Sequence, residues 1–176
     1  MPHNPNIPAY TTRRADADDA SALAHIYNQG IADRNATFET RVRTADDMND
    51  IIDNHEFPCI VACHGDEVIA FASTSRYRTR ECYAGIAEFS VYVERNWRGR
   101  NAGFVVMQAL IETAQAQGFW KLLSRVFVTN TASRRLLANL GFREVGIYHA
   151  HAQLDGQWRD VVIVERYLAN TPPESF

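Results

Sequence analysis

Residues 86–103, IAEFSVYVERNWRGRNAG, join the strongest strand pattern of the chain to a basic turn that contains glycine. Residues 86–93 predict a strand, and the turn at 98–103 leads into a helical pattern that extends to about Gln117. A helix N-terminus offers unpaired backbone N–H groups and the positive end of a dipole, and small residues let a phosphate approach them. The turn is too short for a P-loop and contains no GxGxxG motif, so it does not indicate ATP or dinucleotide binding. The stretch predicts either a phosphate-binding strand–turn–helix unit or an arginine-rich helix start exposed to solvent.

The segments on either side of this stretch predict a sheet covered by helices. Capping-box patterns begin two early helices, at Asp16 and at Thr44. A short helix begins at Asn130 or Thr131 and ends at Gly141. Further strands are expected over residues 59–64, 68–75, 120–128, 143–151 and 158–167. The order is strand, helix, helix, three strands, helix, strand, helix and two strands, which predicts an α/β fold: a mixed sheet with helices on both faces.

Length, composition and charge narrow the class of protein. The 176 residues suit a single domain, expected over residues 10–169 between tails at 1–9 and 170–176. With 18 Lys and Arg against 21 Asp and Glu, the net charge of -3 gives no support for a nucleic-acid partner. Three cysteines without a CxxC pair argue against a disulfide framework and fit a reducing compartment. No apolar segment approaches the roughly 18 residues of a membrane span, and the polar, proline-rich start is no signal peptide, so we expect a cytoplasmic protein without a membrane partner.

The strand SVYV followed by RGRNAG resembles motif A of the GNAT acetyltransferases, whose usual form is Arg/Gln-x-x-Gly-x-Gly/Ala. Arg98 and Gly103 match this form, whereas Asn101 stands where the family prefers glycine; asparagine is the next best residue for positive φ. The resemblance implies a GNAT fold and acetyl-CoA as cosubstrate. In the family, the turn binds the pyrophosphate of this coenzyme, and the backbone of the SVYV strand pairs with its pantetheine arm. An N-x-x-S pair also hydrogen-bonds to the pantetheine arm. The coenzyme-binding residues implied in this way are Val91, Val93, Arg98, Gly99, Arg100, Asn101, Ala102, Gly103, Asn130 and Ser133.

Several segments between about residues 12 and 168 resemble the phosphinothricin acetyltransferase branch, and within it the arsinothricin-resistance enzymes. They read IYNQGIADRNATFET, RYRTRECYAGIAEFSVYV, NTASRRLLANLGFREVG and LDGQWRD. The resemblance implies acetylation of the α-amino group of a small acidic amino-acid analogue of the phosphinothricin, arsinothricin or methionine sulfoximine type, which confers resistance. It also implies a homodimer with acceptor pockets at or near the subunit interface. Two alternatives stay open: an acetyltransferase for another small amine or a peptide N-terminus, and a non-catalytic acetyl-CoA-binding protein.

Glu88 is the candidate catalytic residue. The odd-numbered residues from 87 to 93 are apolar and form one face of the expected strand, while Glu88 lies on the other. A carboxylate in the middle of so apolar a strand needs a reason. An amine acceptor arrives as an ammonium and must lose a proton before it attacks a thioester, and a glutamate can take that proton. The resemblance places the family's proposed base at this position. The plainer alternative is a salt bridge to a nearby arginine.

An arginine run and one aromatic residue are the candidate acceptor contacts. Alternating arginines at Arg76, Arg78 and Arg80 would point the same way in an extended segment, and guanidinium groups suit carboxylate, phosphinate or arsinate oxygens. The resemblance assigns substrate contacts to Arg78, Arg80 and Tyr83, and none to Arg76. A solvated basic loop is the plainer alternative. Phe38 is expected as a wall of the acceptor pocket, because the ATFE stretch matches a family signature.

Departures from the family pattern concern the leaving group and the acceptor. Leu137 stands where many relatives carry Tyr or His, and leucine cannot protonate a leaving thiolate. Leu154 stands where the phosphinothricin branch has Lys, which weakens the expectation that phosphinothricin itself is preferred. His149 and His151 share a strand face, but the sequence indicates no third ligand, so we expect no metal site.

Overall fold

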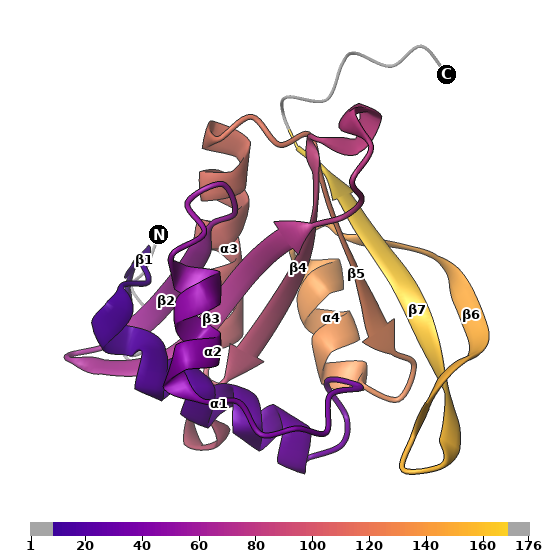
Figure 1. Ribbon diagram of the computed structural model, residues 1–176, viewed down its shortest axis with the longest axis horizontal. Helices are drawn as coiled ribbons and strands as arrows, with labels where there is room; N and C mark the ends of the chain where they lie inside the picture. The colour runs from indigo at the N-terminus through magenta and orange to yellow at the C-terminus, as the bar shows by residue number, and fades with distance from the viewer. Residues whose placement is uncertain (1–8, 169–176) are drawn as a thin grey trace, which may run out of the picture.

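The computed structural model describes residues 9–168, so the expected tails at 1–9 and 170–176 lie outside the described residues except for residue 9. Its strands form a seven-stranded sheet in the order β1-β2-β3-β4-β5-β7-β6 (Figure 1). The strands are β1 Thr11–Arg14, β2 Cys59–His64, β3 Glu67–Arg76, β4 Ile86–Val93, β5 Lys121–Phe127, β6 Arg143–Leu154 and β7 Gln157–Tyr167. The helices are α1 Ala20–Ala32, α2 Ala45–Ile52, α3 Ala102–Ala116 and α4 Thr131–Asn139. The predicted mixed α/β architecture is confirmed, since β4 and β5 are parallel and the other neighbours are antiparallel.

The expected capping boxes begin the first two helices. The side chain of Thr44 accepts a hydrogen bond from the Asp47 backbone N–H, and the Asp47 carboxylate accepts one from the Thr44 N–H at 2.8 Å. The Asp16 box has the same reciprocal geometry, but its first turn is a short 3₁₀ helix that leads into α1. These boxes satisfy backbone donors that a helix start otherwise leaves unpaired.

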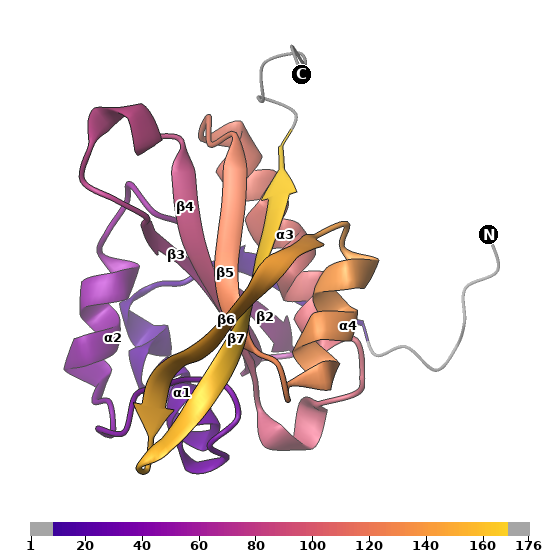
Figure 2. The same ribbon diagram turned by 90° about the vertical axis from the view of Figure 1, so that its right-hand side faces the viewer.

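Helices cover both faces of the sheet, and each face has its own hydrophobic core. Figure 2 shows α1 and α2 on one side of the sheet and α3 and α4 on the other. β4 contributes to both cores: Ala87 and Phe89 pack under α3 and α4, while Tyr92 packs with the residues of α1 and α2. The predicted alternation of β4 is therefore confirmed, and Glu88 shares the face of Tyr92.

The two central strands diverge. β4 pairs with β3 as far as Val93, but it pairs with β5 only from Ile86 to Glu88. Beyond Glu88 the edge of β4 that faces β5 has no ladder partner in the described chain, and Figure 1 shows the two strands separating there. The sheet thus opens at its centre, on the side where β4 leads into the turn before α3.

The hairpin of β6 and β7 carries an irregular segment. Tyr148 pairs with Val161 and Ala152 pairs with Arg159, so the three residues 149–151 of β6 stand opposite the single residue Asp160 of β7. Ala150 has a φ of 47°, in the left-handed region. The Asp160 carboxylate supports this bulge, because it accepts the Ala150 N–H at 2.7 Å and lies 2.9 Å from His149 Nδ1. Both contacts hold the pKa of Asp160 below its usual range, the backbone hydrogen bond more than the imidazole.

Candidate active site

The turn before α3 presents free backbone donors. Gly99 and Asn101 have φ values of 74° and 72°, so the expected positive φ of Asn101 is confirmed. Within the described chain, the backbone N–H groups of residues 99–103 have no hydrogen-bond acceptor. A Cβ placed on Gly99 would have no atom within 4 Å, so the space over the turn is open. The turn therefore has the donors and the room that an anionic phosphate group needs.

Two residues that the sequence did not identify hold this turn in place. The hydroxyl of Tyr10 donates to the Arg100 carbonyl at 2.8 Å. Asp33, just after α1, binds Arg95 at 2.7 Å and Arg98 at 2.6 Å. Burial raises the pKa of Asp33, but the hydrogen bonds from these two guanidinium groups outweigh it and leave the pKa below its usual range. Because these partners lie 62 to 90 residues apart in the chain, no local motif could have revealed them.

The Arg98 side chain stabilises the turn through contacts within the protein and is not a free positive charge over it. Besides its ion pair with Asp33, its Nε donates to the Val93 carbonyl at 3.2 Å. Arg100 instead lies over the Trp97 ring, 5.5 Å from the centroid. The first turn of α3 is packed closely: a Cβ on Gly103 would lie 3.1 Å from Leu136 Cδ2 and 3.3 Å from Val93 Cγ2.

Asn130 caps α4, as the sequence predicts. Its side-chain oxygen accepts the Ser133 backbone N–H at 3.1 Å, and its amide nitrogen donates to the Asn35 carbonyl at 2.9 Å. The second contact joins α4 to the loop after α1, across the opening between β4 and β5. The contacts of Asn130 and Ser133 with a coenzyme remain a prediction.

A cavity of about 450 Å³ lies on the α1 side of the opening between the central strands. Six parts of the chain line it: Tyr27 of α1, Ala36–Glu39 after α1, Ser75 near the end of β3, the middle of β4, the second half of β5, and the irregular part of β6. Both Glu88 and Phe38 line it, and their roles as base and pocket wall stay predictions. The ring of Phe38 packs edge-on against Phe127, with the centroids 4.7 Å apart.

Glu88 forms an ion pair inside this cavity. Nη2 of Arg125 lies 2.8 Å from one carboxylate oxygen of Glu88 and 2.7 Å from the other. The side chains are 25% exposed for Glu88 and 43% exposed for Arg125, so both remain accessible to a small molecule. The salt bridge considered as the plainer role of Glu88 is therefore present, and it does not remove the carboxylate from the cavity. The sequence offered no signal for Arg125 beyond its position on a strand.

The arginine run does not form the expected clamp. β3 ends at Arg76, whose guanidinium binds Glu56 at 3.0 Å, and the chain then bends into a 3₁₀ turn at Glu81–Tyr83. Arg78 lies instead near the rings of Tyr77 and Tyr83, 5.1 and 6.0 Å from their centroids. The expectation that the arginines share one direction is wrong, because the segment is not extended after Arg76.

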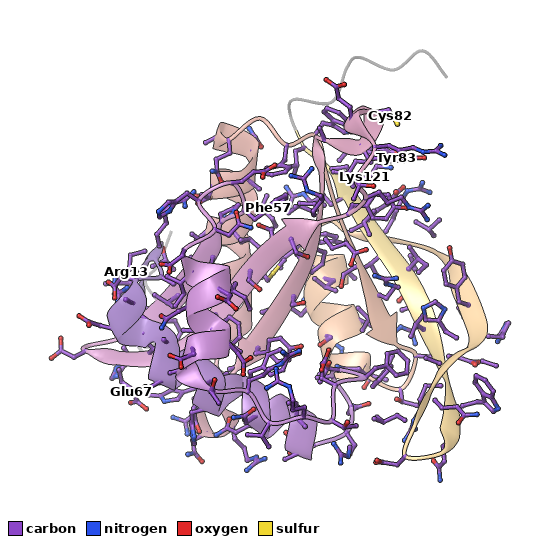
Figure 3. All side chains as sticks on the ribbon, in the orientation of Figure 1. Arg13, Phe57, Glu67, Cys82, Tyr83 and Lys121 are labelled. Atoms are coloured by element: carbon purple, nitrogen blue, oxygen red, sulfur yellow. The ribbon has the colours of Figure 1, made fainter. Side chains whose placement is uncertain are left out.

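None of the three predicted acceptor contacts, Arg78, Arg80 and Tyr83, lines the cavity that contains Glu88. Tyr83 lies at the upper end of the molecule in Figure 3, where Lys121 at the start of β5 is also labelled. Their roles in substrate binding stay predictions.

Leu137 and Leu154, which differ from the residues usual in the family, are both apolar core residues. Leu137 is 1% exposed and belongs to the core under α3 and α4, so it has no proton to give and no access to solvent. Leu154 is also 1% exposed and packs with Phe127 and Val161, next to Phe38. The position expected to carry a lysine in the phosphinothricin branch thus supports the wall of the cavity.

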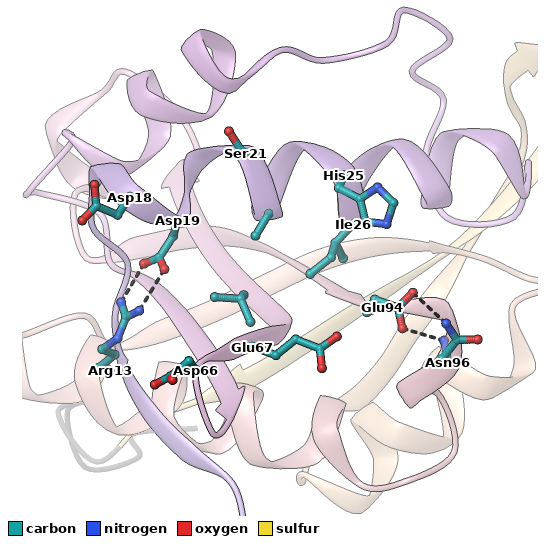
Figure 4. Close-up of a pocket in the computed structure, with 12 residues that line it drawn as sticks. Arg13, Asp18, Asp19, Ser21, His25, Ile26, Asp66, Glu67, Glu94 and Asn96 are labelled. Atoms are coloured by element: carbon teal, nitrogen blue, oxygen red, sulfur yellow. Dashed lines mark hydrogen bonds and ion pairs between the residues drawn. The ribbon is translucent and has the colours of Figure 1, made fainter.

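A second cavity, of about 680 Å³, lies between α1 and the turn from β2 to β3. Two of its five carboxylates have partners: Figure 4 shows Asp19 paired with Arg13 and Glu94 bound to Asn96. It contains no predicted site residue. We therefore take the cavity around Glu88 as the candidate active site.

Other kinds of site have no support in the described part of the chain. Residues 9–168 contain no group of three or more His, Cys, Asp and Glu side chains placed to hold a metal ion. No helix in the same range is long and apolar enough to cross a membrane. Burial raises the pKa of the Cys59 thiol to about 12, which fits an inert core residue rather than a nucleophile.

Comparison with known proteins agrees with this geometry. The L-methionine sulfoximine/L-methionine sulfone acetyltransferase of Pseudomonas aeruginosa is 31% identical over 174 residues, covering 90% of this chain and 95% of that protein. The phosphinothricin N-acetyltransferase of Streptomyces coelicolor is 27% identical over 157 residues, covering 86% of this chain and 92% of that protein. A GNAT superfamily phosphinothricin acetyltransferase from Sinorhizobium meliloti, solved in complex with AcCoA, superposes with a TM-score of 0.84 at 27% identity and covers 94% of both chains.

The family itself follows from the match to a family model. The model of the acetyltransferase (GNAT) family matches residues 23–142, which include β4, the turn, α3, β5 and α4. These elements build the opening and the free donors, and the matched range includes most of the residues that line the cavity. The chain therefore belongs to the GNAT family of acetyltransferases and is an acyltransferase enzyme.

Proposed function

We propose that this enzyme transfers the acetyl group of acetyl-CoA to the α-amino group of a small acidic amino-acid analogue, of the phosphinothricin, arsinothricin or methionine sulfoximine type. The observation that carries the proposal is Glu88, an accessible carboxylate on the floor of a small cavity where β4 and β5 diverge. The names of the relatives support the acceptor class. We further propose that the enzyme acts in the cytoplasm and confers resistance to such an analogue; the free cysteines Cys59, Cys63 and Cys82 fit a reducing compartment.

The described residues fit acetyl-CoA. The free N–H groups of residues 99–103 suit its pyrophosphate, and the unpaired edge of β4 at Val91 and Val93 suits the amide groups of its pantetheine arm. Asn130 and Ser133 lie at the start of α4 on the far side of the opening, which supports their assignment to the same ligand.

In the proposed reaction, acetyl-CoA supplies an activated thioester. Glu88 accepts a proton from the acceptor's ammonium, and the freed amine forms a bond to the acetyl carbon while the carbon–sulfur bond breaks. A backbone N–H near Val91 stabilises the negative charge that develops on the carbonyl oxygen. The nitrogen loses its second proton to water as the amide forms. Leu137 supplies no proton, so the thiolate leaves as such or takes a proton from water.

We also propose that the enzyme is a homodimer and that Arg78, Arg80 and Tyr83 contribute to acceptor binding. The hairpin of β6 and β7 carries a set of exposed, large apolar side chains, which is typical of an interface. They are Val145 at 49%, Ile147 at 44%, Tyr148 at 53%, Trp158 at 63% and Tyr167 at 43% exposure. A second copy of the chain packed against this hairpin would cover part of this set.

The test is release of free CoA from acetyl-CoA, followed by a thiol reagent, with phosphinothricin, arsinothricin, methionine sulfoximine and glutamate as acceptors. We expect rapid release with one or more of the three analogues. In the Glu88→Gln variant kcat falls by about 10²- to 10⁴-fold, because a general base has been removed. The matched control is Glu67→Gln, which changes an exposed glutamate far from the cavity.

Three results would contradict the proposal. Release that is unchanged in Glu88→Gln would show that Glu88 is not the base. Binding of acetyl-CoA without release from any acceptor favours the second candidate, a non-catalytic acetyl-CoA-binding protein, which the apolar residue at Leu137 supports. Release of CoA only with a peptide or another amine would show that the acceptor belongs to a different chemical class.

A further inference from the structure

The cavity that contains Glu88 also contains one fixed positive charge. Among the residues that line it, Arg125 is the only arginine, and there is no lysine. It contacts Glu88 through Nη2 alone, at 2.7 and 2.8 Å. The cavity wall therefore presents an anion and a cation side by side. An amino acid presents the complementary pair, since its ammonium and its carboxylate are attached to the same carbon.

Building on the proposed function, we propose that Arg125 binds the α-carboxylate of the acceptor, while Glu88 faces the α-ammonium. Arg125 is thus a specificity-determining residue that selects α-amino acids over simple amines. The assignment concerns the α-carboxylate, which all the proposed acceptors share.

The hydrogen-bond capacity of Arg125 allows this second partner. A guanidinium has five N–H donors, and Nη2 carries two of them. Within the described chain, Nε and Nη1 of Arg125 have no hydrogen-bond acceptor. The side chain is 43% exposed, so the three free donors can reach a ligand in the cavity. A carboxylate can then bind to Arg125 while the contact with Glu88 remains in place.

The sheet fixes this arrangement. Glu88 pairs with Leu123 in the parallel ladder, and Arg125 follows two residues later on the same face of β5. The antiparallel pair of Arg125 with Ile163 of β7 holds β5 on its other edge. The guanidinium is therefore carried by a strand that is paired on one side and borders the opening on the other.

The test compares two acceptors that differ only at the α-carboxylate: L-methionine sulfoximine and its α-carboxamide. In Arg125→Leu, we expect the KM for the amino acid to rise by about tenfold to a hundredfold, the usual effect of losing a hydrogen bond to a charged group, with little change in kcat. The KM for the carboxamide stays within about twofold. Arg125→Lys recovers part of the affinity for the amino acid. Arg14→Leu, an exposed arginine of β1, is the matched control.

The outcomes separate the possible roles. A fall in kcat of equal size on both acceptors, without a rise in KM, would show that Arg125 acts only by positioning Glu88 and would overturn the proposal. Unchanged kinetics on both would overturn it as well. The circular dichroism spectrum and the Tm of each variant confirm that it is folded.

Failure of the proposed function gives a different pattern, because wild-type enzyme then releases no CoA from either acceptor. In that case binding of the same two compounds is measured by calorimetry in the presence of CoA. Preference of wild type for the amino acid, lost in Arg125→Leu, supports the carboxylate assignment without turnover. Equal or absent binding of the two compounds to wild type refutes it.

Discussion

Asn101 shows how one residue controls a binding turn. Its φ of 72° places it in the left-handed region, which asparagine tolerates better than other residues with a Cβ, and glycine better still. The next residue, Ala102, is the first of α3, so the conformation of Asn101 sets the direction of the donors at the helix start.

We expect Asn101→Ala to raise the KM for acetyl-CoA by about threefold to thirtyfold, because forcing alanine into this conformation costs about 1–2 kcal/mol. Asn101→Gly keeps the wild-type KM or lowers it. Steady-state kinetics with varied acetyl-CoA measure both. An equal loss in the alanine and glycine variants would mean that the asparagine side chain, rather than the backbone, is needed.

At the scale of elements, the start of the parallel pair of β4 and β5 depends on a glycine. The Trp120 N–H donates to the Gly85 carbonyl at 2.8 Å, just before the two strands pair. A Cβ on Gly85 would lie 2.0 Å from Cε3 of the Trp120 ring, so the indole has to move if this position carries a side chain.

Gly85→Ala is expected to lower the free energy of unfolding by about 1–3 kcal/mol, the usual cost of overpacking. Urea unfolding followed by circular dichroism measures the loss. Gly146→Ala is the matched control, because a Cβ there would meet no atom within 4 Å. Equal stability of the two variants would show that Trp120 relocates without cost.

Local patterns predicted the elements but not how they meet. The alternation of β4 and the capping boxes depend on neighbours in the chain, and the structure confirms both. The contact of Glu88 with Arg125 depends on the register of two strands whose residues lie 37 apart, and no local pattern records that register. The alternating arginines from Arg76 to Arg80 predict an extended segment, but the chain bends after Arg76 and forms a 3₁₀ turn at Glu81–Tyr83. The sequence thus identifies candidate site residues, but it does not predict which of them are in contact.

At the scale of the whole molecule, the exposed apolar side chains of β6 and β7 lead to a prediction about assembly. We expect sedimentation equilibrium to give a dimer, and Trp158→Glu to shift the protein toward monomer because a charge replaces a side chain that is 63% exposed in one chain. Val42→Glu is the matched control, since Val42 is 64% exposed but lies on a distant loop. A monomeric wild type, or equal assembly of both variants, would contradict the dimer.

The free energy of unfolding should decrease at acid pH, because two buried carboxylates lose their ion pairs when they are protonated. Burial raises the pKa values of Asp19 and Glu165, but hydrogen bonds from Arg13 to the first carboxylate, and from Lys121 and Arg143 to the second, outweigh burial and leave both pKa values below their usual range. A carboxyl group whose pKa is lower in the folded state stabilises the fold fully above its unfolded pKa, about 4, and loses this contribution as the pH falls through the folded pKa.

We therefore expect a nearly constant Tm from pH 7 to about 5 and a decline below about pH 4. In Asp19→Asn the Tm at pH 7 is lower and the decline is shallower, because Arg13 has lost its ionised partner. Calorimetry across this range measures both. An identical slope in wild type and variant would assign the acid sensitivity to other groups.

The bulge of β6 has a consequence for how the length of this hairpin can change. Three residues of β6 stand opposite one of β7, so β6 has two extra residues here. Because side chains alternate between the two faces of a strand, two extra residues leave that alternation unchanged. Tyr148 before the bulge and Ala152 after it therefore point to the same faces as they would in a regular ladder. Removing one residue from 149–151 would leave a surplus of one, which either forms a bulge like the one at Val145 or turns the buried Leu154 toward solvent. Removing two would restore a regular ladder and withdraw His151 from the cavity wall. We therefore expect the removal of two residues here to lower the Tm less than the removal of one.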